Sequence, residues 1–181
     1  MNFLIAQLMG LVGLIYSIVS MYKEDRRTVL ILVTITNSFY LLQYSLLGAI
    51  SGIIITLIAV IRGIIFYHYD KQNKNTPLFI LLILIVLLTI LSYFNYKDLY
   101  SLLTLFAGIS YTYGVWQNNL KIFRITALIA PICFIIYNIH VLAYAGSFAS
   151  LVEAIMALIA IIKIDVLKSN KHDIIKTQEG E

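Results

Sequence analysis

The sequence predicts an all-α integral membrane protein with seven transmembrane helices, arranged as two parallel three-helix bundles joined by a linker helix. Three observations support this fold class: the composition, the length of the apolar runs and the one-sided distribution of basic residues. Of 181 residues, 61% are hydrophobic and 12% are charged, whereas soluble domains carry about 45–50% apolar and about 25% charged residues. The mean hydropathy is +0.92. With two prolines, nine glycines and one cysteine, the composition excludes disordered, collagen-like and disulfide-rich chains.

The first apolar run, residues 3–21, predicts an uncleaved transmembrane helix. A secretory signal peptide carries its basic residues before the apolar run. Here the basic residues Lys23, Arg26 and Arg27 follow the run instead. This order favours a first helix whose N-terminus lies outside the cell.

The second and third helices, predicted at residues 29–48 and 51–69, come from one continuous apolar stretch. A single crossing of about 30 Å of hydrocarbon needs roughly 20 residues, and this stretch is about twice that length. It contains one formal charge, Arg62, and its helix-breaking residues lie between Gly48 and Gly52. The chain is therefore expected to turn there.

The remaining helices are predicted at residues 78–95, 100–117, 125–144 and 147–163. The run at 78–95 is the most uniformly aliphatic of the seven, which is typical of a helix facing lipid. The last two helices again share one long apolar stretch, and the turn between them is predicted at Tyr144–Ser147.

The basic residues predict the orientation of the chain in the membrane. With these seven spans, eleven of the thirteen Lys and Arg residues lie on one side. The exceptions are Lys97 on the other side and Arg62 within a helix. The positive-inside rule then places the N-terminus outside and the C-terminus in the cytoplasm. The pI of about 9.1 is therefore explained by loops facing anionic lipid, and no nucleic-acid partner is expected.

A weak internal repeat predicts the domain organisation. The matches that carry it pair Lys23 with Lys121, Arg26 with Arg124, Thr28 with Thr126, Gly10 with Gly108 and Gly48 with Gly146, all at an offset of 98 residues, which also aligns Tyr40 with Asn138. Two three-helix units can share one orientation only if an extra helix joins them. We expect a first unit at 1–69, a linker helix with flanking loops at 70–99, a second unit at 100–163 and a cytoplasmic tail at 164–181.

Small residues at helical spacing predict the faces on which three of the helices pack closely. The first helix presents Ala6, Gly10, Gly13, Ser17 and Ser20, the third Gly52, Thr56, Ala59 and Gly63, and the seventh Gly146, Ala149, Ser150, Glu153, Ala157 and Ala160.

Two ionisable residues, Arg62 and Glu153, lie inside predicted spans. A charge at the bilayer centre costs at least about 2.5–3.5 kcal/mol on insertion scales, so each is expected to face the bundle or a wet cavity. For Arg62 the alternatives are snorkelling toward headgroups, a structural ion pair or hydrogen bond, and a ligand contact. For Glu153 they are a structural polar role and a role in ligand binding or proton coupling.

Amide and phenol side chains extend this candidate set. Asn37 and Tyr40 share a face of the second helix with Tyr44, while Asn138 shares a face of the sixth helix with Pro131. Such side chains either line a polar cavity or cross-link helices by hydrogen bonds. The candidate substrate-binding residues are Asn37, Tyr40, Arg62, Asn138 and Glu153.

Catalytic and metal-binding patterns are not found in the sequence. His68, His140 and His172 are predicted at separate depths, Cys133 is alone, and no HExxH, GxSxG or P-loop motif is present. We expect neither an enzyme nor a cofactor or metal. The expected partners are the lipid bilayer and an unidentified small solute, with the chain acting as a monomer or a homo-oligomer.

Several short motifs resemble the YgjV-type bacterial inner membrane proteins. They are Ala6-Gln7 with Gly10, Asp25-Arg26-Arg27, Tyr40-Leu-Leu with Gly48, Ile61-Arg62, and the stretch from Asn138 through Gly146 to Glu153. The resemblance covers about residues 4–165. It implies a multi-pass protein of the bacterial inner membrane.

That family is similar in plan to the SWEET and PQ-loop transporters, in which two three-helix units alternate access to a central site. The resemblance thus implies a small-solute transporter or facilitator, with a non-transporting partner subunit or receptor-like module as the alternative. The first and fifth helices here lack the hinge prolines of SWEET-type proteins, so a sugar substrate is not implied.

Overall fold

The computed structural model describes residues 2–96 and 98–167, and within them the chain is helical with no strand. The predicted fold class, an all-helical membrane protein, is confirmed. The helices are α1 (Asn2–Met21), α2 (Arg26–Leu47), α3 (Ile50–Lys71), α4 (Leu78–Phe94), α5 (Leu99–Trp116), α6 (Leu120–His140) and α7 (Tyr144–Ala160), followed by a π-helix, η1 (Ile161–Leu167). Most of the predicted tail at 164–181, and Lys97, lie outside the described residues.

The ends of α2 are set by local chemistry. Asp25 has extended backbone, and its side chain accepts a hydrogen bond from the Thr28 N–H at 2.9 Å, which satisfies a free donor of the first helical turn. This cap starts the helix three residues before the predicted boundary. At the other end Gly48 takes the left-handed conformation with φ +66°, which glycine adopts without steric cost. The turn predicted between Gly48 and Gly52 is therefore confirmed in its first part only, because α3 already begins at Ile50 and includes Gly52.

The turn predicted at Tyr144–Ser147 is wrong by three residues. α6 ends at His140 and α7 already begins at Tyr144, so the chain turns through residues 141–143, where Leu142 has φ +58°. Gly146 lies inside α7 and serves close packing instead. A Cβ atom there would lie only 3.2 Å from the Asn138 amide nitrogen.

Among the residues that the structure describes, five helices are long and apolar enough to cross a membrane: α1, α2, α3, α6, and α7 with the first residues of η1. α4, with 17 residues, is apolar but shorter than these. Exposed aliphatic side chains cover the outside of the bundle, as in Ile83 of α4, which is 59% exposed. These surfaces suit contact with lipid tails.

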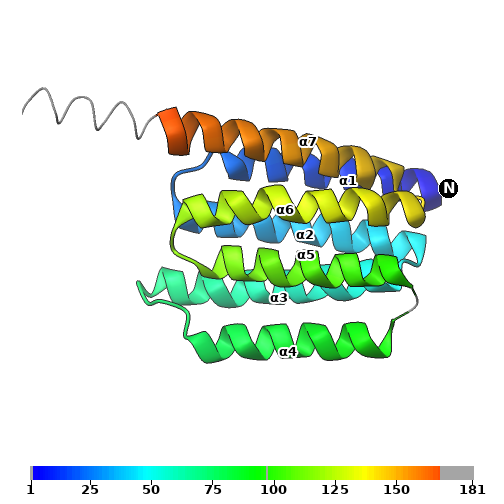
Figure 1. The fold of residues 1–181 in the computed structure, drawn as a ribbon, viewed down its shortest axis with the longest axis horizontal. Coiled ribbons are helices and arrows are strands. Elements are labelled where there is room, and N and C mark those ends of the chain that lie inside the picture. The colour runs from blue at the N-terminus through cyan, green and yellow to red at the C-terminus, as the bar shows by residue number, and fades with distance from the viewer. Residues whose placement is uncertain (1, 97, 168–181) are drawn as a thin grey trace, which may run out of the picture.

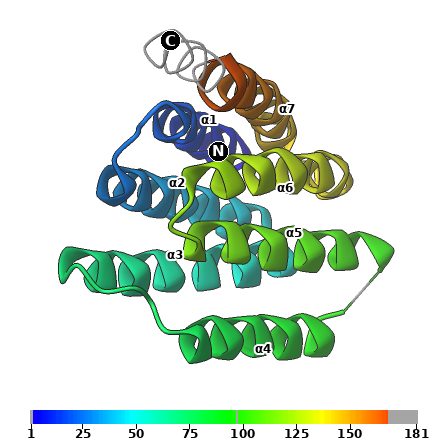
Figure 2. The same cartoon turned by 60° about the vertical axis from the view of Figure 1, so that its left-hand side comes forward.

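The helices lie side by side in two layers. Figure 1 shows α1, α2 and α3 behind α7, α6 and α5, with α4 along one edge. Within each layer α2 and α6 are central, and the layers meet where α1 packs on α7 and where α3 packs on α5. Figure 2, turned by 60°, shows α4 below α3 and α5, and these are the two helices it contacts. The division into repeated units at 1–69 and 100–163 stays a prediction.

The predicted small-residue faces of α1, α3 and α7 are all buried, as predicted. On α7 the buried residues are the predicted set and no others. On α4, Leu81, Leu84 and Leu88 turn inward toward α3 and α5. α4 thus has one packed face and one exposed face.

Candidate functional site

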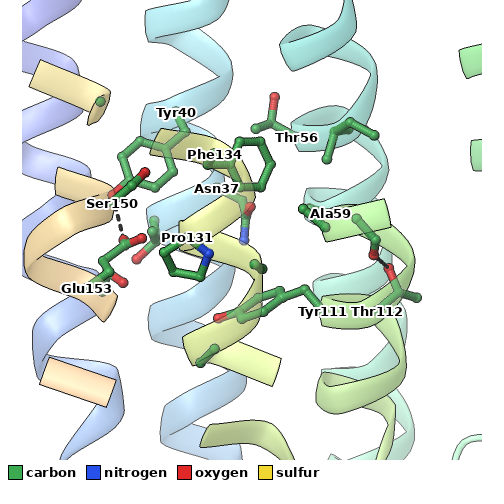
Figure 3. Close-up of a pocket in the computed structure, with 18 of the residues that line it drawn as sticks. Asn37, Tyr40, Thr56, Ala59, Tyr111, Thr112, Pro131, Phe134, Ser150 and Glu153 are labelled. Carbon is green, nitrogen blue, oxygen red and sulfur yellow. Dashed lines mark hydrogen bonds between the residues drawn. The ribbon is translucent and has the colours of Figure 1, made fainter. Parts of the chain in front are cut away.

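A cavity of about 70 Å³ lies between the two layers, lined by side chains from all seven α-helices. The five candidate residues all line it: Asn37, Tyr40, Arg62, Asn138 and Glu153. So do seven further polar side chains that the sequence patterns did not select as binding residues: Ser17, Thr36, Tyr44, Thr56, Tyr111, Thr112 and Ser150. Figure 3 shows Tyr40 and Glu153 on one side of this space, with Tyr111 and Thr112 on the other.

Glu153 is buried, with 8% of its surface exposed. The Tyr40 hydroxyl donates a hydrogen bond of 2.6 Å to its Oε1 atom, drawn as a dashed line in Figure 3. This contact joins α2 of one layer to α7 of the other. A buried carboxylate needs such donors, because an unsatisfied one is costly in an apolar interior.

Arg62 faces the bundle interior and is only 2% exposed. Its Nη1 donates a 2.7 Å hydrogen bond to the Thr112 hydroxyl, and its guanidinium carbon lies 5.3 Å from the centre of the Tyr111 ring. The snorkelling alternative is therefore wrong. α3 carries Arg62 on the same buried side as Ala59 and Phe66, so the side chain points into the bundle toward α5.

Two of the three guanidinium nitrogens of Arg62, Nε and Nη2, have no hydrogen-bond partner in the part of the chain that the structure describes. Native proteins pair the large majority of their buried polar atoms. An open pair of donors on a cationic side chain that lines a cavity is therefore the most informative feature of this site.

Asn138 links three helices at another part of the cavity wall. Its Oδ1 accepts a hydrogen bond of 2.7 Å from the Tyr44 hydroxyl, and its Nδ2 donates to the Ser150 hydroxyl at 3.2 Å. Tyr137, its neighbour, accepts a hydrogen bond of 2.8 Å from the Gly52 N–H through its hydroxyl. Asn138 thus both lines the cavity and cross-links α2, α6 and α7.

Asn37 and Pro131 face the cavity with simpler local chemistry. Asn37 donates its amide to the Val33 carbonyl of its own helix at 2.7 Å. Pro131 sits inside the continuous helix α6. Because proline has no N–H, the Ala127 carbonyl lacks its usual helical donor at the cavity wall.

Gln43 is a buried polar residue that the sequence reasoning missed. It is fully buried, and both its amide nitrogen and its amide oxygen lack a partner among the described residues. Gly10 makes room for it, because a Cβ at that position would lie 2.6 Å from the Gln43 amide. A glutamine inside an apolar span was visible in the sequence, but its position opposite Gly10 depends on how α1 and α2 pack together.

One end of the bundle carries most of the described basic residues, and we call it the basic end. There Arg26, at the start of α2, donates hydrogen bonds to the Val115, Trp116 and Gln117 carbonyls at the end of α5. A cation at a helix C-terminus is favourable because it meets the free carbonyls and the negative end of the helix dipole. Arg26 also lies 3.2 Å from Asp70, so it connects α2, α3 and α5.

The opposite end, which we call the far end, is held by a different set of contacts. His140 Nε2 lies 2.8 Å from an Asp98 carboxylate oxygen, and the Tyr100 ring stacks on the imidazole with centroids 4.2 Å apart. The side chain of Gln7 on α1 accepts a 2.7 Å hydrogen bond from the Ala145 N–H on α7. Contacts between the layers therefore exist at both ends of the cavity.

No cluster of three or more His, Cys, Asp or Glu side chains that could hold a metal ion is found in residues 2–96 and 98–167. Cys133 is a free thiol in the same range.

A family model described as Imp-YgjV, bacterial inner membrane protein, matches residues 4–168. Comparisons with curated proteins and with solved structures find no match. The family match covers nearly the whole chain and agrees with its several long apolar helices. The chain therefore belongs to the Imp-YgjV family of bacterial inner membrane proteins and is a multi-pass protein of that membrane.

Proposed function

We propose that the protein is a small-solute transporter or facilitator without enzymatic activity. In this proposal the three-helix units 1–69 and 100–163 rock against each other and expose the central cavity to one side of the membrane at a time. The N-terminus lies outside and the basic end faces the cytoplasm.

The observation that carries the proposal is the cavity between the two layers and its polar lining. Ionisable residues within a membrane bundle typically mark solute or ion pathways, and transporters of repeat architecture bind their substrates near the midplane between the repeats. Arg62 and Glu153 come from different layers and face the same space. A helix bundle that served only as a scaffold has no need for both charges in one cavity.

The contacts at the two ends of the bundle fit the roles of gates. Arg26 bridges the layers at the basic end, and Gln7 bridges them at the far end. Alternating access requires that one such set opens while the other stays closed. Both sets consist of a few polar contacts, which can be exchanged for water at modest cost.

The experiment is uptake of a solute panel into proteoliposomes that contain the purified protein. We expect time-dependent, saturable accumulation of at least one solute class above empty vesicles. Substitution of Asn37, Asn138 or Glu153 by alanine should reduce that uptake. Ser45→Ala serves as the matched control, because Ser45 is exposed on α2 and hydrogen-bonds only its own helix.

The alternative is a non-transporting membrane module, such as a partner subunit, that reuses the same scaffold. It would predict no flux for any solute in the panel. It would also predict that the three cavity substitutions alter stability without altering permeability. That outcome would overturn the transport proposal.

A further inference from the structure

We propose that the cavity binds a small organic carboxylate, whose two oxygens pair with the Nε and Nη2 edge of Arg62. Such a carboxylate would be the substrate of the proposed transporter, so the inference rests on the proposed function. Binding itself can be measured without transport.

The first step is the unmet hydrogen bonding of Arg62. Its side chain is 2% exposed, and Nε and Nη2 have no partner among the described residues. Each buried donor left without a partner costs about 1–3 kcal/mol, and more when the group is charged. Since the side chain lines the cavity, a molecule inside the cavity is placed to accept both bonds.

The second step is the geometry of the free donors. Nε and Nη2 lie on one edge of the planar guanidinium, and their N–H bonds point in parallel toward the same side. This edge matches the two oxygens of a carboxylate, which it binds in a bidentate manner. A neutral hydroxyl or carbonyl group presents a single oxygen, so it cannot form the two parallel, charge-assisted bonds that a carboxylate forms.

The third step is the way the neighbouring residues hold this edge in place. The Thr112 hydroxyl donates to the Gly108 carbonyl at 2.6 Å, so its lone pairs are directed at Arg62 Nη1. The Tyr111 ring lies against the guanidinium carbon. Thr112 and Tyr111 therefore engage the rest of the guanidinium and leave the Nε and Nη2 edge open.

The fourth step is charge. Within the described residues no carboxylate lies within ion-pair distance of Arg62: Asp70 pairs with Arg26 and Arg27, and Asp98 pairs with His140. Glu153 directs Oε1 to Tyr40. A buried cation without a counter-ion is strongly disfavoured in a low-dielectric interior, and an anionic ligand relieves that cost.

The fifth step is size. A water molecule occupies about 10–15 Å³ of such cavity volume, so this cavity of about 70 Å³ holds roughly five waters. Ile55 and Leu88 supply apolar wall beside the polar groups. A short acid with a few carbon atoms fits these limits, whereas a long-chain fatty acid exceeds them.

The test is thermal unfolding of the purified, detergent-solubilised full chain with matched ligand pairs. Lactate is compared with lactamide, and propionate with propionamide, at equal concentration and ionic strength. We expect both carboxylates to raise the unfolding midpoint saturably and both amides to leave it unchanged. Equal shifts within each pair, or no shift with either acid, would overturn the inference. A shift with inorganic phosphate but with neither acid would overturn it as well.

Substitutions locate the site. Arg62→Gln should weaken lactate binding by at least about thirtyfold, as expected when one partner of a buried charge pair is removed. Arg62→Lys should also weaken it, because an ammonium lacks the two-donor edge. Thr104→Val is the control: Thr104 is buried on α5, lies outside the cavity and bonds the Ser101 carbonyl. Unchanged lactate binding in a folded Arg62→Gln variant would contradict the assignment. If that variant does not fold, the comparison of acids with amides on the wild-type protein decides whether the cavity binds a carboxylate.

Binding and transport fail in different ways. If lactate stabilises the protein but no flux is measured in proteoliposomes, the carboxylate site stands and the transport proposal fails. If a neutral solute is transported and no carboxylate binds or competes with it, transport stands and the carboxylate assignment is overturned.

Discussion

At the level of single residues, the hydrogen bond from Tyr40 to Glu153 is the shortest polar link between the two layers in the described cavity, at 2.6 Å. Tyr40→Phe should lower the free energy of unfolding by about 1–3 kcal/mol, because it leaves a buried carboxylate with one donor fewer. The measurement is thermal or denaturant unfolding of the purified variant in detergent.

The control for this prediction is the same change in a Glu153→Gln background. Removing a hydrogen-bond donor destabilises a buried neutral amide less than a buried carboxylate. Tyr40→Phe should therefore lower the free energy of unfolding by a smaller amount in the Glu153→Gln background. Equal costs in both backgrounds would mean that the bond carries no charge-dependent energy.

Gly63 is a second residue whose role can be tested directly. A Cβ atom at this position would overlap the Thr34 hydroxyl and lie 3.1 Å from the Thr34 Cβ. Gly63→Ala should therefore destabilise the protein by about 1–3 kcal/mol, as overpacking does. The double variant Gly63→Ala with Thr34→Ala should recover most of this loss in thermal unfolding. A double variant less stable than Gly63→Ala alone would show that α2 and α3 do not meet at these residues.

Residue identity predicted the lining of the cavity better than it predicted the contacts inside it. Arg62 and Glu153 were recognisable because charges inside apolar spans must face a protected interior. Their partners were not recognisable. Thr112 meets Arg62 only because α3 and α5 pack together, and the chain separates these residues by 50 positions.

At the level of elements, the start of α2 makes a pH-dependent contribution to stability. Hydrogen bonds from the Thr28 side chain and backbone lower the pKa of Asp25, which is exposed outside the membrane-spanning segments. A carboxyl with a lowered folded pKa stabilises the fold above its unfolded pKa of about 3.9, and this contribution is lost as pH falls through the folded value.

Asp25→Asn keeps the cap and removes the titration. The wild type should exceed it in unfolding temperature by a constant small margin above about pH 5, and this margin should shrink as the pH falls below the unfolded pKa of about 3.9 and through the lower folded pKa. Thr28→Val, which removes the hydroxyl donor but keeps the N–H, should shrink the pH-dependent part. A margin that grew toward acid pH would contradict the sign of the pKa shift.

Element boundaries were predictable where a local signal decides them and not where packing does. Gly48 ends α2 in the left-handed conformation that its type favours. Gly146 gives the same signal in the sequence but lies within the first turn of α7, where the absence of a side chain lets Asn138 and Gln43 approach. A glycine in an apolar run can mark either a turn or a close helix contact, and only the neighbouring helix distinguishes them.

At the level of the whole molecule, helix number follows from length and hydropathy, whereas the order of the helices around the cavity does not. Apolar spans of similar composition offer no preference for one neighbour over another in lipid, because packing detail and polar contacts decide association there. The pairing of α1 with α7 and of α3 with α5 could therefore not be predicted from the sequence pattern of any single helix.

Those pairings supply the sharpest test of motion between the layers. The Ser51 and Ser101 hydroxyls lie 3.2 Å apart, on α3 and α5 near the far end, so cysteines at both positions come within reach of a disulfide. The test uses the double variant Ser51→Cys and Ser101→Cys in a Cys133→Ser background. Oxidation should abolish its solute uptake, because a disulfide prevents the layers from separating at that end. A reductant should restore the uptake. Each single cysteine variant, treated in the same way, should keep its uptake. Full solute flux through the cross-linked protein would rule out rocking of the two layers as the transport motion, because only a pathway that needs no such motion would conduct solute with the disulfide in place.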